Sequence, residues 1–446
     1  MVLDLRRFYQ ACNPGEPLSM SNAEERQYYI DFSPVRGGRI IEALERTIAD
    51  LSPNQPTCQL FTGHIGCGKS TELLRLKAGL ERRDFHVVYF ESSHDLELND
   101  VDVTDILLAI AGQVSESLEA IKIRLQPGYF ASLFAELSDF LHTPIELSGE
   151  AELSLGIGKL TAKTKESPNL RHRMRNWLEP RTNSILQAIN DEILLKADAE
   201  LKRRGKQGLV VIVDNLDRVD LRPMPVSGRS QPEYLFIDRG EQLRKLKCHV
   251  VYTIPLSLIF SNECETLKNR LGGGLTPKVL PMVPVRLRTG DECVAGMSLL
   301  RQMVLKRAFP DPAIATESEQ ILAIFDTSAT LDRLCWISGG HVRNLLGLLY
   351  SCLQQQDPPL SKDCLESVIR ERRDYLISSI DDREWELLFQ VVKQQMVRGD
   401  IEYQTLLRSQ WVYEYRDSEG SWFCINPALA ETRKFQQWLR NNSITL

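Results

Sequence analysis

Gly63-His64-Ile65-Gly66-Cys67-Gly68-Lys69-Ser70-Thr71 is the most informative motif in this chain. Its two outer glycines are separated by four residues and followed by Lys69 and Ser70, which is the pattern of a phosphate-binding loop. The five residues before it, 58–62, predict a short buried strand, and leucines follow it at helical spacing over 73–80. A strand, a glycine-rich loop and a helix in this order predict a nucleotide site.

Each residue of the loop has an expected task in that site. The glycines let backbone N–H groups converge on phosphate oxygens, and the start of the helix adds a partial positive charge. We expect Lys69 to reach the β- and γ-phosphates and the Ser70 hydroxyl to hold Mg²⁺. The residues expected to bind ATP are Gly63, His64, Ile65, Gly66, Cys67, Gly68, Lys69, Ser70 and Thr71.

The composition is that of an ordinary soluble protein. The 446 residues are enough for two to three domains, with 43% hydrophobic and 26% charged residues. The net charge of −6 gives no general attraction for nucleic acid, so any such binding must come from a local patch. The sequence has no apolar run of about 20 residues, as a membrane span would need. The scattered cysteines predict reduced thiols and a cytoplasmic protein.

Further strands predict a parallel α/β sheet of the P-loop type, with its ligand at the carboxyl edge. They are expected at 85–91, 209–214, 249–253 and 279–283, the last an edge strand because of Pro281. The near-continuous apolar run Leu209 to Val213 is typical of a strand buried on both faces, and it ends in Asp214. We expect Asp214 to hold the Mg²⁺ of bound ATP.

The stretch from about 125 to 206 is expected to be a mostly helical insertion. Alternating residues over 152–163 predict a small hairpin or an extended arm. A solvated helix face, a nucleic-acid contact and a contact with a neighbouring subunit all fit its basic cluster. That cluster consists of Lys163, Lys165, Arg171, Arg173, Arg175 and Arg181.

The C-terminal third is expected to be helical until a late hairpin. Helices are predicted from about 290 to 355 and from 361 to 394, and 411–426 predicts a β-hairpin. Helices followed by such a hairpin are the outline of a winged helix. The expected domains are an N-terminal extension (1–35), a P-loop core (36–288), a helical lid (289–358) and a winged helix-turn-helix (359–446).

With these motifs the chain resembles the AAA+ and STAND branches of the P-loop ATPases. Residues 63–71 resemble a Walker A loop and 210–217 a Walker B strand, and Asp214-Asn215-Leu216-Asp217-Arg218 is similar to the signature of STAND and KAP-type ATPases. The resemblance implies that Thr253 is a sensor-1 residue and Arg343 the sensor-2 arginine that reaches the γ-phosphate. In outline, the lid and winged helix are also similar to origin-recognition initiator ATPases.

The sequence departs from that resemblance at two positions. Many AAA+ proteins carry a Glu directly after the Walker B Asp to polarise the attacking water, whereas this chain has Asn215, which cannot take a proton. Asp217 or Glu91 could substitute, with Asp217 slightly preferred and a structural role open for both. Arg270 lies near the usual place of an arginine finger, although the STAND-like motif implies that none is needed.

The resulting expectation is an ATP-dependent switch that hydrolyses ATP slowly and moves its lid and winged helix with nucleotide state. The expected partners are ATP with Mg²⁺ and either a partner protein or a second copy of the chain. The first alternative is a DNA-binding AAA+ ATPase that acts on duplex DNA through the winged helix and the basic insertion. The second is a regulatory module that binds ATP without turnover.

Overall fold

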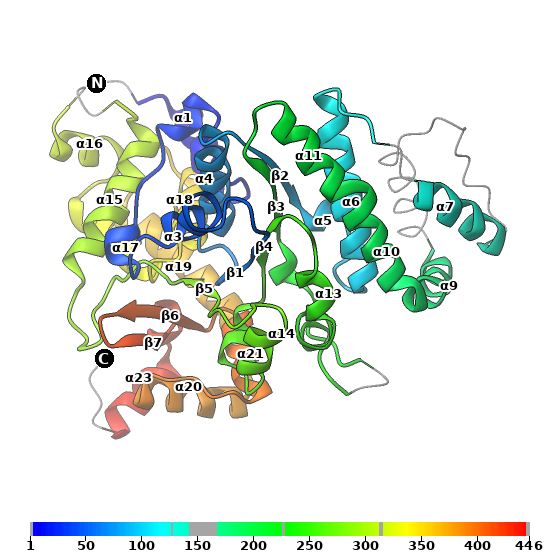
Figure 1. Ribbon diagram of the computed structural model, residues 1–446. Helices are drawn as coiled ribbons and strands as arrows, with labels where there is room; N and C mark the ends of the chain where they lie inside the picture. The colour runs from blue at the N-terminus through cyan, green and yellow to red at the C-terminus, as the bar shows by residue number, and fades with distance from the viewer. Residues whose placement is uncertain (1–2, 126–127, 142–166, 225–227, 312–314, 443–446) are drawn as a thin grey trace. The chain divides into compact units, whose positions relative to one another are not determined.

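The computed structural model describes residues 3–125, 128–141, 167–224, 228–311 and 315–442 (Figure 1). The described chain divides into two compact units. The first comprises residues 1–40, 63–74 and 279–446, and the second comprises 41–62 and 75–278. The loop 63–71 therefore belongs to the same unit as the C-terminal third of the chain.

A five-stranded sheet in the order β2-β3-β4-β1-β5 carries the α/β fold. The strands are β1 (Cys58–Gly63), β2 (Phe85–Glu91), β3 (Gly208–Asp214), β4 (His249–Thr253) and β5 (Lys278–Leu280). The pairs β2–β3, β3–β4 and β4–β1 are parallel. Every residue of β3 is buried, as its apolar run predicts. The register places Glu91 opposite Asp214, so both carboxylates lie at the carboxyl edge.

Helices of the second unit pack on this sheet and share its apolar core. Helix α6 contacts β2 and α11 contacts β3. Asp102 and Asp105 form a capping box that starts α6, and the buried face of that helix carries residues such as Ile106 and Ile110. The α-helices from the first strand to the last are α4 (Lys69–Arg82), α5 (Ser92–Asp95), α6 (Val103–Ala120), α7 (Gly128–Leu141), α9 (Pro168–Leu178), α10 (Thr182–Ala188), α11 (Leu195–Arg203), α12 (Gln231–Glu233), α13 (Gly240–Arg244) and α14 (Cys264–Arg270).

Shorter helical turns and the segment before β1 complete this part of the chain. Helix α3 (Ile40–Arg46) continues directly into the π-helical turn η2 (Thr47–Leu51). The remaining turns are η3 (Glu179–Arg181), η4 (Ile189–Leu194), η5 (Leu216–Arg218), η6 (Tyr234–Asp238) and η7 (Leu256–Phe260). Turn η5 starts directly after Asn215, which has a left-handed backbone (φ 64°).

Apart from the loop 63–71, the end of strand β5 and a two-stranded hairpin, the regular structure of the first unit is helical. Its helices are α1 (Leu5–Ala11), α2 (Ala23–Arg26), η1 (Ser33–Val35), α15 (Val294–Ala308), α16 (Glu317–Ile324), α17 (Ser328–Ile337), α18 (Val342–Gln355), α19 (Lys362–Ile377), α20 (Asp382–Gln394), α21 (Ile401–Arg408), α22 (Pro427–Ala430) and α23 (Arg433–Asn442). The antiparallel hairpin consists of β6 (Val412–Asp417) and β7 (Gly420–Ile425). Helices α20 and α21 followed by this hairpin have the outline of a winged helix, and we call residues 381–442 the winged-helix segment.

The predicted fold class is confirmed: the chain has a parallel P-loop-type sheet with helices and a C-terminal hairpin. The predicted strands and the hairpin lie within a few residues of those observed. Helix α17 lies within the stretch 290–355 that the sequence predicts to be helical. The predicted hairpin at 152–163 lies outside the described residues, and the domain boundaries stay a prediction. None of the described helices is long and apolar enough to cross a membrane.

Candidate functional site

The loop 63–71 connects strand β1 to helix α4 with two glycines in left-handed conformations, Gly66 (φ 86°) and Gly68 (φ 105°). Residues other than glycine rarely adopt such backbone angles, which explains why glycine occupies both positions. Helix α4 begins at Lys69, so Lys69 and Ser70 lie in its first turn. The ammonium of Lys69 is buried and donates hydrogen bonds to the carbonyls of Gly63 and His64, both at 2.9 Å.

Three successive carbonyls of this loop accept hydrogen bonds from residues far away in the sequence. The Ile65 carbonyl accepts from His341 Nε2 (2.8 Å) and Gln410 Nε2 (2.9 Å). The Gly66 carbonyl accepts from the backbone N–H of Arg343 at 3.1 Å. The Cys67 carbonyl accepts from the guanidinium of Arg36 at 2.8 Å. The loop is therefore held by the N-terminal segment, by the lid helix α18 and by the winged-helix segment.

These bonds set the direction of the loop's N–H groups. In a trans peptide the carbonyl and the following N–H point in opposite directions. Donors on the Ile65 and Cys67 carbonyls therefore turn the N–H groups of Gly66 and Gly68 to the other side of the loop. Backbone N–H groups that converge in this way at the start of a helix are suited to phosphate oxygens. The arrangement fits a nucleotide.

A second set of contacts joins the loop to strand β6. The backbone N–H of Glu414 donates to His64 Nε2 at 2.9 Å, and the Glu414 carbonyl accepts from the N–H of Met282 at 3.0 Å. His64 and Glu414 are both buried. Burial, with smaller contributions from His341 and Lys69, lowers the pKa of His64 to about 3, so this imidazole is neutral and can accept the bond. Burial also raises the pKa of Glu414 to about 7.

The lid helix packs directly on the loop at Gly66. A side chain at Gly66 would lie 2.7 Å from His341 Cε1 and 2.9 Å from Arg343 Cβ, so only glycine allows this approach. His341 is the N-cap of α18, because its Nδ1 accepts from the N–H of Asn344 at 3.0 Å. Arg343, the predicted sensor-2 residue, thus lies beside the loop, and its Nε donates to the carbonyl of Pro14 at 3.2 Å.

In the other unit, polar residues gather at the carboxyl edge of β2 and β3. Asp214 is fully buried, and its carboxylate accepts from the hydroxyl of Tyr89 (2.9 Å) and the N–H of Asn215 (2.7 Å). The Asn215 amide donates to Glu91 at 2.7 Å. The residue that replaces the expected glutamate therefore orients a neighbouring carboxylate. The structure brings Glu91, Asp214 and Asn215 together, as the parallel strands predict.

Thr253 lies at the end of the neighbouring strand and supports the turn after Asp214. Its hydroxyl donates to the Val213 carbonyl at 3.3 Å and accepts from the Leu216 N–H at 3.0 Å. Asp217 lies in that turn and is buried. Arg270 ends α14, contacts Asp238 at 3.7 Å and donates to the Ile237 carbonyl at 3.4 Å. The roles predicted for these residues stay predictions.

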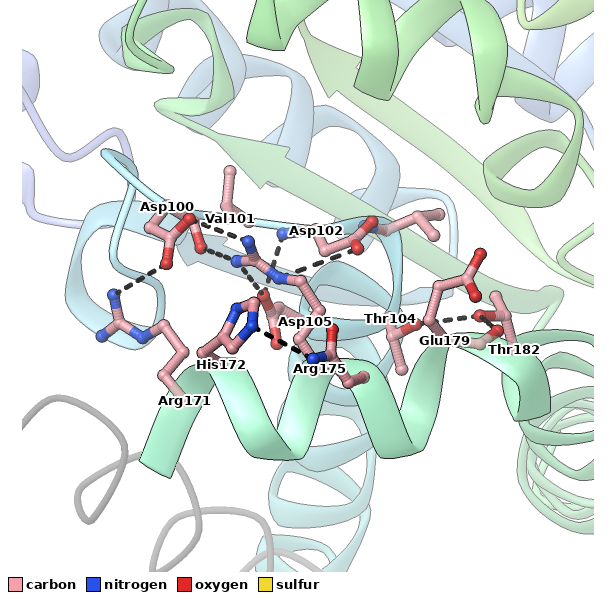
Figure 2. Close-up of polar contacts among 12 residues, drawn as sticks. Asp100, Val101, Asp102, Thr104, Asp105, Arg171, His172, Arg175, Glu179 and Thr182 are labelled. Carbon is pink, nitrogen blue, oxygen red and sulfur yellow. Dashed lines mark hydrogen bonds and ion pairs between the residues drawn. The ribbon is translucent and has the colours of Figure 1, made fainter. Parts of the chain in front are cut away.

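The described arginines of the basic cluster make contacts within their own unit. Figure 2 shows Arg171 and Arg175 of helix α9 turned toward Asp100, Asp102 and Asp105. The guanidinium of Arg175 lies 2.8 Å from Asp100, 3.8 Å from Asp102 and 3.9 Å from Asp105. Two of the cluster's positive charges, those of Arg171 and Arg175, are therefore paired with these aspartates.

The remaining members of the cluster differ in kind. Arg173 lies over the ring of Phe140 and Arg181 over the ring of Trp177. A guanidinium over the face of an aromatic ring is attracted by the ring's quadrupole, so these two arginines also contact their own unit. Lys163 and Lys165 lie outside the described residues. The cluster is therefore partly an internal ion-pair network.

The comparisons with known proteins agree with the loop and the sheet. The model of the KAP family P-loop domain matches residues 38–225, which include the loop 63–71 and strand β3. This stretch is therefore similar to the KAP family P-loop domain. The predicted resemblance to KAP-type ATPases is confirmed. None of the curated proteins compared with the chain matches it.

Several solved structures are similar to the chain at low identity. The ORC2 protein of Aeropyrum pernix is 12% identical, with complete coverage of both chains and a TM-score of 0.45. The Walker-type ATPase paby2304 of Pyrococcus abyssi is 12% identical, with 91% of this chain and 98% of that one covered and a TM-score of 0.42. The ORC1 protein of Aeropyrum pernix, solved with DNA, is 14% identical, with 89% and 94% covered and a TM-score of 0.36.

Three residues far along the chain hold the loop 63–71 and were not predicted: His341, Gln410 and Glu414. Each lies more than 270 positions from the loop, so no local pattern links them to it. One signal was available for Glu414, an isolated carboxyl in the otherwise apolar run Val412 to Tyr415. A buried carboxyl costs free energy, and it marks a position with a specific task.

Proposed function

We propose that this protein is an ATP-binding and slowly ATP-hydrolysing switch that couples nucleotide state to its lid and winged-helix segment. The observation that carries the proposal is the set of hydrogen bonds from His341, Arg343 and Gln410 to the carbonyls of Ile65 and Gly66. Phosphate binding by this loop acts on the peptide groups that these three residues hold. A change at the loop is therefore transmitted to the lid and hairpin.

The proposal gives the remaining polar residues defined tasks. Lys69 binds phosphate, the Ser70 hydroxyl and Asp214 each supply oxygen ligands of the kind Mg²⁺ prefers, and Thr253 and Arg343 respond to the γ-phosphate. Bound Mg²⁺ would neutralise charge on the phosphates during their transfer to water. Glu91 and Asp217 are the two candidates for activating that water. The hydrogen bond from Asn215 to Glu91 supports Glu91 as an oriented carboxylate.

Binding of a labelled ATP analogue to the wild type and to Lys69→Ala tests the site. We expect the substitution to lose binding, because it removes the cation that meets the phosphates. A circular-dichroism melt of Lys69→Ala controls for folding, because Lys69 also bonds two loop carbonyls. Equal affinity in a folded variant would remove the site assignment.

Phosphate release with and without duplex DNA, together with the mass in ATP, tests the switch. We expect slow turnover that DNA does not change, because the chain is acidic overall and Arg171 and Arg175 face aspartates. Stimulation by DNA with a steep salt dependence would favour the DNA-acting ATPase instead. Tight ATP binding without phosphate release would favour the regulatory module.

A further inference from the structure

Gln410 is an unusual residue in the connection between α21 and β6. Its backbone is left-handed (φ 60°), a conformation that glycine adopts far more readily than glutamine. Its carbonyl accepts from Asn426 Nδ2 at 3.0 Å and its N–H donates to the Leu407 carbonyl at 3.3 Å. A glycine would satisfy both of these backbone bonds with less strain, so the turn by itself does not explain the glutamine.

The side chain of Gln410 does make a contact that glycine could not. Its amide Nε2 donates to the Ile65 carbonyl at 2.9 Å, at the tip of the phosphate-binding loop. Strained backbone that persists in this way is typical of residues held for a functional reason. His341 donates to the same oxygen from the lid side, so two donors from different segments hold one peptide group.

We propose that Gln410 is a positioning residue for nucleotide binding, an inference that rests on the proposed function. Its bond to the Ile65 carbonyl turns the Ile65–Gly66 peptide so that the Gly66 N–H faces the phosphate side. The loop is then organised before the ligand arrives, which lowers the ordering cost of binding. The winged-helix segment thereby contributes to affinity for ATP and ADP without touching either.

The test is Gln410→Gly, measured for nucleotide affinity and for thermal stability. We expect affinity for ATP and ADP to fall roughly threefold to tenfold, because one of the two donors to Ile65 is lost. We expect the melting temperature without nucleotide to stay the same or rise, because glycine relieves the left-handed strain. If Gln410 had only a structural role, the substitution would change the melting temperature and leave the nucleotide affinity unchanged.

Gln395 offers a matched control in the same winged-helix segment. It is also a left-handed glutamine (φ 51°), and its Nε2 also donates to a backbone carbonyl at 2.9 Å, but that carbonyl belongs to Arg288. Gln395→Gly should leave nucleotide affinity unchanged. Equal loss of affinity in both variants would overturn the proposal, and so would unchanged affinity in Gln410→Gly.

Hydrogen–deuterium exchange of residues 63–69 without nucleotide separates this inference from the proposed function. Gln410→Gly should exchange faster there than the wild type or Gln395→Gly, whether or not the protein hydrolyses ATP. Failure of the wild type to bind ATP, with faster loop exchange in the variant, would reject the proposed function but retain the role of Gln410 in shaping the loop. Unchanged loop exchange would overturn that role.

Discussion

Glu414 shows how one residue can link a binding loop to a distant hairpin. Its N–H holds His64, its carbonyl bonds Met282, and its carboxyl is fully buried with one oxygen bonded to Ser421 at 2.7 Å. Within the described part of the chain, its other carboxyl oxygen is buried without a hydrogen-bond partner. Such a carboxyl is less costly when protonated, which explains why its pKa rises.

This burial predicts a specific pH dependence of stability. The folded pKa is about 7 against an ordinary 4.5, so the folded protein holds an extra proton between those values. The stability that this extra proton gives to the folded protein is fully present below about pH 4.5 and is lost as the pH rises through 7. Relative to Glu414→Gln, the free energy of unfolding of the wild type should fall by about 3 kcal/mol over that window.

Urea unfolding of both proteins from pH 4.5 to 7.5 measures that difference. The pH dependence of stability that comes from His64 has the opposite sign. Its folded pKa is about 3, so its contribution is fully present above its ordinary pKa of 6.5 and is lost as the pH falls through 3. Because His64 is present in both proteins, its contribution cancels in the comparison. A constant difference across the range would contradict the raised pKa.

At the scale of elements, helix α9 is joined to the segment before α6 by ion pairs (Figure 2). Although burial opposes it, hydrogen bonds from Arg175 and Arg222 lower the pKa of Asp100. Burial raises the pKa of Asp105 to about 6, so the acidic residues of this network are not equivalent. Asp100 is the one that contacts all three arginines, Arg171, Arg175 and Arg222.

Asp100→Asn should therefore destabilise the chain and loosen α9. We expect a loss of about 1 kcal/mol at low salt, discounted for the partial exposure of the site, and a smaller loss at high salt. Amide hydrogen exchange over residues 169–178 should become faster. Asp84→Asn is the control, because Asp84 contacts Lys206 at 3.6 Å on an exposed surface and asparagine tolerates its left-handed backbone. Equal effects of the two substitutions would argue against a network.

At the scale of the whole molecule, binding at the loop should be detectable at the hairpin. Linkage is reciprocal: if the hairpin helps the loop to bind nucleotide, nucleotide must stabilise the hairpin contacts. We expect ATP to slow amide exchange over residues 410–415 in the wild type and to have no effect in Lys69→Ala. Unchanged exchange in the wild type at saturating ATP would contradict the coupling, and faster exchange would mean that nucleotide loosens the hairpin.

The loop, the strands and the polar residues that end them could all be predicted from local sequence patterns. Glycine spacing and unbroken apolar runs are local properties, so 63–71 predicts a phosphate loop and 209–214 a buried strand before any fold is known. Parallel pairing then places Glu91 beside Asp214, because all carboxyl ends meet at one edge. The winged-helix outline could also be predicted, because the patterns of its helices and its hairpin are local properties of the sequence.

The residues that hold the loop and the contacts of the basic cluster depend on how the elements pack, so local patterns could not predict them. His341, Gln410 and Glu414 reach the loop across about 280 to 350 positions, and hydrogen bonds in which one partner is a backbone group leave no pattern in the sequence. The pairing of Arg175 with Asp100 likewise depends on helix α9 packing beside the start of α6. Local spacing encodes elements and their ends, whereas partners distant in sequence become neighbours only when those elements pack.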